Sequence, residues 1–105
     1  MNRRHKKVRR KPTHPGMLLR EETIPAAGLT TSELAARLGV SPRGINELLR
    51  ERRSVNADLA HRLARVFNTT PEFWLRLQEA VDIWDAWQAN RQEYDRLKPV
   101  RERAA

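Results

Sequence analysis

The chain has 105 residues, enough for one small domain; 39% are hydrophobic, 32% are charged, and the formal net charge is +8. It contains no cysteine, which excludes disulfides, thiolate metal sites and thiol catalysis. No apolar run approaches the length of a membrane span or a signal-peptide core, so the composition predicts a soluble intracellular protein.

The positive charge is concentrated at the N-terminus. Residues 1–14 carry +7 of the net charge and no acidic residue, which leaves +1 for the other 91 residues. A basic segment of this kind is typically disordered and often binds nucleic acid. We therefore predict a disordered basic arm over 1–14, a folded domain over 15–98 and a C-terminal tail over 99–105. A solvated leader without a function is the alternative interpretation of the arm.

The first predicted helix lies over 17–24. A turn at 13–16 precedes it, and Pro15 suits the first position of a helix. Pro25 and Gly28 are expected to break it, because neither residue continues a helix well.

The second predicted helix lies over 31–38. Thr30 stands three residues before Glu33, which is the spacing of a capping box. Gly39 is expected to end this helix, since glycine is common just past a helix end.

The third and fourth helices are predicted over 42–51 and 57–67. Ser41 is expected to cap the third, with Pro42 at its first position. Asn56 is expected to cap the fourth, whose apolar residues recur at a spacing of 3.6.

The fifth helix is predicted to run unbroken from Pro71 to Pro99. Apolar residues step along it by four and three, with Arg91 as the polar exception: Phe73, Leu77, Ala80, Trp84, Trp87 and Tyr94, with Trp74 and Val81 beside them. The first half is expected to join the core. The second half outruns the core that four short helices offer, so Trp84, Trp87 and Tyr94 are predicted to form a dimer or partner interface. The alternative is that this half folds back and buries them.

The third helix is predicted to have two different faces. Three apolar side chains are expected to pack on the second and fourth helices: Ile45, Leu48 and Leu49. At about 100° per residue, polar side chains gather opposite them: Arg43, Asn46, Glu47 and Arg50. Arginine suits guanine, asparagine suits adenine, and glutamate accepts from cytosine. Because only Gly39 and Val40 join the two helices, the all-α chain is predicted to contain a helix-turn-helix whose second helix enters the major groove.

Other side chains are predicted to contact DNA phosphates. Thr31 and Ser32 begin the second helix, where a hydroxyl and free helix N–H groups favour an anion. Arg50, Arg52 and Arg53 end or follow the third helix. Phosphate contacts set the register of a protein on DNA but do not read its sequence. A solvated polar surface is the alternative for each arginine.

Catalysis and metal binding have little support in the sequence. The three histidines, His5, His14 and His61, lack zinc-ligand spacing, and His14 is expected to be a turn or packing residue. No acid–base pair and no glycine-rich phosphate loop stands out. We expect no enzyme activity, no metal and no cofactor. An RNA-binding or membrane-surface protein is an alternative that rests only on the basic arm.

Four blocks of the sequence resemble the HigA antitoxins, the VapI/HigA-like branch of the lambda-repressor-like, XRE-family helix-turn-helix proteins. They read HPGMLLREE, LTTSELAARLGVSPRGINELL, ADLAHRLARVF and TTPEFWLRLQ, and the resemblance covers roughly residues 12–90. The stretch AVDIW is also similar to that of uncharacterised HigA-like regulators.

The resemblance implies a five-helix DNA-binding domain that binds an operator palindrome as a dimer. The residues it places at the major groove are Ser41, Pro42, Arg43, Asn46 and Glu47. It also implies a small RelE/HigB-like ribonuclease toxin, which the antitoxin neutralises while repressing the shared promoter. Such a protein is expected in the bacterial cytoplasm, at the nucleoid when bound. A stand-alone XRE-family repressor without a toxin would carry the same residues.

Two places depart from the family's pattern. Where the family often has Asn-Gly-Lys-Arg after the third helix, residues 50–53 read Arg-Glu-Arg-Arg. Since the glycine is missing, the turn geometry and its phosphate contact stay open. Gly44 replaces a common polar residue, which costs helix stability and removes one side chain that could contact DNA.

Overall fold

Helices make up most of the part of the chain that the computed structural model describes, residues 10–101. In chain order they are α2 (Pro15–Leu18), η1 (Leu19–Thr23, a π-helical stretch), α3 (Ile24–Ala27), α4 (Thr31–Leu38), α5 (Pro42–Leu49), α6 (Ala57–Phe67) and α7 (Pro71–Arg96). Because α2, η1 and α3 follow one another without a break, residues 10–101 form five helical segments and no strand. The predicted all-α, five-helix fold is confirmed. Residues 1–9 of the predicted arm and 102–105 of the predicted tail lie outside the described residues.

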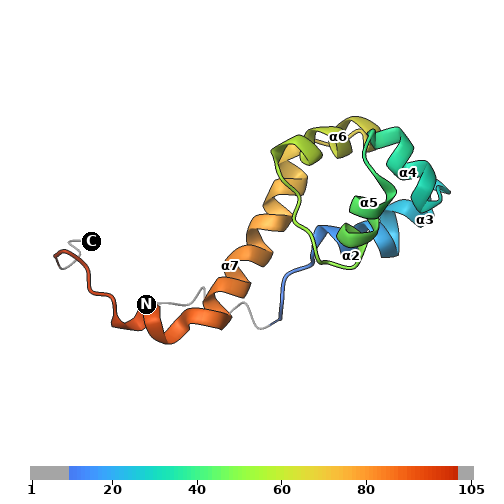
Figure 1. The fold of residues 1–105 in the computed structure, drawn as a ribbon. Coiled ribbons are helices and arrows are strands. Elements are labelled where there is room, and N and C mark those ends of the chain that lie inside the picture. Colours follow the sequence, from blue (N-terminus) through green and yellow to red (C-terminus); the bar gives the residue numbers. More distant parts are fainter. Residues whose placement is uncertain (1–9, 102–105) are drawn as a thin grey trace.

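The core lies where the first helical segment, α4, α5, α6 and the beginning of α7 meet (Figure 1). Its most deeply buried large side chains come from all five segments: Leu19, Leu34, Ile45, Leu48, Leu63 and Trp74. Burial of these apolar surfaces is the main stabilising contribution to so small a domain. This shared core holds the five helical segments in fixed positions relative to one another.

The first helical segment differs from its prediction. It spans residues 15–27 and passes through Pro25, so the expectation that Pro25 breaks it was wrong. In an α-helix, a proline ring clashes with the carbonyl four residues back. Here the preceding turn is π-helical, with the Ile24 N–H donating to the Leu19 carbonyl, and this wider turn accommodates the ring. Gly28 ends the segment as expected.

His14 begins this segment as its N-cap, which confirms the expected turn role. Its side chain is buried, and Nδ1 accepts a hydrogen bond of 2.9 Å from the Gly16 N–H. Burial disfavours the charged imidazolium and lowers the pKa of His14 below its ordinary value, although the nearby charge of Glu51 acts in the opposite direction.

We expect the free energy of unfolding to decrease as the pH falls from above 6.5 to below the folded pKa of His14. Because the folded pKa of His14 lies below the unfolded value of 6.5, the unfolded chain binds a proton first. The loss therefore begins near pH 6.5 and is complete below the folded pKa. Urea denaturation across this range measures it. His14→Asn keeps an N-cap acceptor that does not titrate, so its profile should be flatter; parallel profiles would exclude His14 as the cause.

Helix α7 packs on the core along one edge of the predicted stripe, the edge formed by Trp74 and Val81, with Leu77 half-buried beside them. Trp74, Gln78 and Val81 are buried, whereas Phe73 and Ala80 of the predicted stripe are exposed. The packing of α7 against α6 decides which side of the stripe is buried. The apolar spacing along α7 alone did not distinguish its centre from its edge. The expectation that the first half of α7 joins the core is confirmed, with its face corrected.

A polar side chain occupies the middle of this buried face. Gln78 Oε1 accepts a hydrogen bond of 2.9 Å from the Val55 N–H, and Nε2 donates to Asp82 Oδ1 at 2.9 Å. Both ends of the amide are thus satisfied, which a buried polar group requires. Gln78 thereby ties α7 to the segment that follows α5.

The second half of α7 extends away from the other helices (Figure 1). Asn90 leaves helical geometry (φ −129°, ψ 20°), and its Nδ2 donates to the Ala86 carbonyl at 3.3 Å. The expectation of an unbroken helix to Pro99 was therefore wrong: α7 kinks at Asn90 and ends at Arg96. Residues 88–96 are all exposed, so this half does not fold back onto the domain.

Candidate nucleic-acid interface

A tight turn joins α4 and α5, and its geometry follows from its sequence. Gly39 has a φ of 71°, a left-handed conformation that glycine adopts at little cost. The next N–H, of Val40, bonds to the Ala35 carbonyl at 3.0 Å. Ser41 Oγ then accepts the Gly44 N–H at 3.1 Å and begins α5. The predicted helix-turn-helix and the predicted cap are both present.

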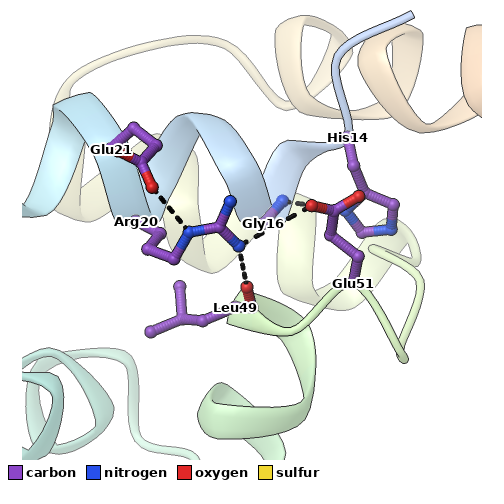
Figure 2. A network of polar contacts seen from close by, with 6 residues as sticks. All are labelled: His14, Gly16, Arg20, Glu21, Leu49 and Glu51. Atoms are coloured by element: carbon purple, nitrogen blue, oxygen red, sulfur yellow. Dashed lines mark hydrogen bonds and ion pairs between the residues drawn. The ribbon is translucent and has the colours of Figure 1, made fainter. Parts of the chain in front are cut away.

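Two arginines bind the C-terminal ends of these helices. Arg62 of α6 donates from Nη1 to the Leu38 carbonyl at 2.8 Å and from Nε to Asp58 at 2.8 Å. Arg20 of η1 donates from Nη1 to the Leu49 carbonyl at 2.6 Å (Figure 2). A cation is favourable at the negative end of a helix. The arginines therefore connect α4 and α5 to the rest of the domain.

Arg20 is held in place by two carboxylates. Figure 2 shows its guanidinium between Glu21, at 2.8 Å, and Glu51, at 3.6 Å. The hydrogen bond to Glu21 contributes most to raising the pKa of Arg20. The contacts of Arg20 and Arg62 with the helix ends were not predicted from the sequence. For Arg62, the spacing of four from Asp58 was a usable signal, whereas Arg20 and Leu49 are 29 residues apart and gave none.

The residues predicted to read bases lie on the outer side of α5. Four of them are exposed and the last is half-buried: Ser41, Pro42, Arg43, Asn46 and Glu47. The side chain of Arg43 is 89% exposed, and its Nε lies 3.7 Å from Glu47 Oε2. An ion pair this exposed contributes little to stability, so a DNA base or phosphate could replace it at small cost.

The residues predicted to contact phosphate lie in two places. At the start of α4, Thr31 is half-buried and Ser32 is exposed. The capping hydroxyl there belongs to Thr30, which accepts the Glu33 N–H at 3.1 Å, while the Thr30 N–H donates to Glu33 and lowers the pKa of its carboxyl group. The capping box is thus confirmed. Arg50, Arg52 and Arg53 are all exposed at and after the end of α5.

The turn after α5 is left-handed although it has no glycine. Glu51 has a φ of 62°, its N–H bonds to the Leu48 carbonyl, and the Arg52 N–H bonds to the Glu47 carbonyl, each at 2.9 Å. Helix α5 therefore ends at Leu49 instead of the predicted residue 51. A side chain in this conformation costs about 1–2 kcal/mol, which the pairing of Glu51 partly offsets.

We expect Glu51→Gly to be more stable than Glu51→Ala by about 1 kcal/mol. Both variants lose the ion pair with Arg20, but only glycine also relieves the left-handed strain. Urea denaturation of the two variants and the wild type measures the difference. Equal stability of the two variants would show that the turn relaxes when the pair is lost.

The predicted dimer or partner residues lie on the second half of α7. Trp84 and Trp87 are half-buried, and Tyr94 is exposed. The rings of Trp87 and Tyr94 stack with centroids 6.0 Å apart and an interplanar angle of 23°. Lys11 Nζ lies 3.5 Å from Asp85 Oδ1, so the segment before α2 passes beside this part of the helix.

Between residues 10 and 101, no helix is long and apolar enough to cross a membrane. Over the same residues, no group of three or more histidine or acidic side chains could hold a metal ion.

Known proteins share this arrangement of helices. The helix-turn-helix family matches residues 19–74. The chain is 39% identical to the uncharacterized HTH-type transcriptional regulator YbaQ of Escherichia coli, over 92% of this chain and 88% of that protein. Its structure is similar to that of Pseudomonas aeruginosa antitoxin HigA with the higBA promoter, with a TM-score of 0.81 and 36% identity over 87% of this chain and 100% of that one. It is also similar to antitoxin GraA in complex with its operator, with a TM-score of 0.81 and 41% identity over 89% and 95%. The chain therefore belongs to the helix-turn-helix family, in the branch of the HigA-like antitoxins.

Proposed function

We propose that this protein binds double-stranded DNA sequence-specifically by inserting α5 into the major groove. The observation that carries the proposal is the exposed polar side of α5, on a helix whose C-terminal end Arg20 holds against the domain. Its base-reading residues are Ser41, Pro42, Arg43, Asn46 and Glu47. Its phosphate-binding residues are Thr31, Ser32, Arg50, Arg52 and Arg53. These groups have the donors and acceptors that base edges and phosphates require.

The protein acts as a dimer on an operator palindrome. Trp84, Trp87 and Tyr94 lie on the half of α7 that leaves the domain, and aromatic surfaces of this kind are enriched at interfaces. A two-fold dimer would place two copies of α5 about 34 Å apart, one turn of DNA. The positive charge of residues 1–14, which precede the proposed 15–98 domain, would add contacts with DNA that do not depend on its sequence.

As an antitoxin, the protein would neutralise a small RelE/HigB-like ribonuclease and repress their shared promoter. The similarity to HigA and GraA, both described as antitoxins on DNA, supports this function. A stand-alone repressor is the second candidate, because YbaQ is described only as a transcriptional regulator. Either function places the protein at the bacterial nucleoid.

Purification of the tagged chain from its native locus distinguishes the two candidates. A small basic protein in equal amount is the expected companion of an antitoxin. The purified chain should also prefer a duplex from upstream of its own gene over a scrambled duplex. A specific DNA complex without a protein companion would make it a stand-alone repressor. Equal binding to both duplexes would contradict the base-reading role of α5.

A further inference from the structure

Arg53 lies against the first turn of α5, in space that Gly44 leaves open. A β-carbon at residue 44 would stand only 2.5 Å from Arg53 Nη1 and 3.3 Å from Ser41 Oγ. Gly44 is buried under this side chain. Any larger residue at position 44 would therefore have to displace the guanidinium.

The N–H groups of the Arg53 guanidinium are available to bind a ligand. Within residues 10–101 it makes no hydrogen bond and no ion pair, in contrast to Arg43 and Arg62. Asp58 lines the same hollow of about 60 Å³ beside α5, but its carboxylate is already paired with Arg62 at 2.8 Å. Five N–H donors thus remain for a ligand from outside the chain.

We propose that Gly44 positions Arg53 to bind a DNA backbone phosphate at the edge of the groove that the first turn of α5 enters. This inference rests on the proposed DNA-binding function. The first turn of a recognition helix comes closest to the bases, so a cation beside it lies near the flanking phosphates. A guanidinium binds phosphate through two parallel N–H groups. On this view, Gly44 does not lose a DNA contact but makes room for one.

Three variants of the full chain test the pair: Arg53→Ala, Gly44→Ala and the double replacement. Binding is measured over a range of salt concentrations to a duplex from upstream of the gene and to a scrambled duplex of equal length. Arg53→Ala should weaken binding to both about tenfold and reduce the log–log salt slope by about 0.9. Gly44→Ala should do the same while raising Tm, because alanine is the better helix former. The double variant should be no weaker than Arg53→Ala.

Arg65→Ala is the matched control, since it removes the same charge from an exposed position on α6. An equal loss in this control would reduce the effect to net charge and overturn the inference. A loss confined to the upstream duplex, with binding to the scrambled duplex unchanged, would make Arg53 a base reader, which also overturns it. Unchanged binding by Gly44→Ala would remove the positioning role. If the wild type does not distinguish the two duplexes, the proposed sequence-specific function fails, but the ratio of variant to wild type still decides this inference.

Discussion

Trp74→Ala should lower the free energy of unfolding by about 3–5 kcal/mol. The indole is 1% exposed, and its Nε1–H donates to Thr69 Oγ1 at 2.8 Å. Its ring also packs against Phe67, with centroids 6.2 Å apart. Since domains of this size have a total stability of about 5–15 kcal/mol, the variant would lose a large share of its stability. The loss would be large because Trp74 joins α7 to the core.

Urea denaturation followed by far-ultraviolet circular dichroism measures this loss. The protein concentration is held constant, because the stability of a dimer depends on it. Phe73→Ala is the control: Phe73 is 41% exposed and contacts Trp74 edge-on at 5.1 Å, so it should cost only about 1 kcal/mol. Equal losses at the two positions would contradict the buried face of α7 described above.

Arg43→Ala should weaken binding to the operator by about 1–3 kcal/mol and relax specificity at one base pair. The guanidinium is almost fully exposed near the beginning of α5, and among residues 10–101 its only ion pair is the long one with Glu47. Removal of so exposed a side chain should leave Tm unchanged. The effect is therefore expected in DNA recognition and not in folding.

Binding to a set of operators, each with one base pair changed, measures this effect. Arg96→Ala is the control, because it removes an equal charge from an ion pair of the same type, Arg96–Glu93 at 3.1 Å, at the far end of α7. The control should bind the operator as the wild type does. If Arg43→Ala instead weakened binding to every duplex equally, Arg43 would be a phosphate contact.

The accuracy of the sequence predictions depended on the range of the interactions involved. The bounds of α4 and the starts of α5, α6 and α7 were predicted correctly, because each cap is a contact over three residues. Each N-cap side chain accepts a backbone N–H three residues on: Thr30, Ser41, Asn56 and Thr70. The break expected at Pro25 and the unbroken helix expected through Asn90 were both wrong. A π-helical turn and a kink within a helix have no comparable short sequence pattern.

By itself, the sequence determined the five helices, the tight turn at Gly39 and the polar side of α5. Capping, glycine geometry and helical periodicity act within about four residues, so they can be read locally. Only the tertiary structure decided which face of α7 is buried and which arginine binds the end of α5. It also decided that Glu51 adopts the left-handed turn. These features depend on contacts between distant residues, such as Val55 with Gln78 over 23 positions and Arg20 with Leu49 over 29, whose partners no local pattern specifies.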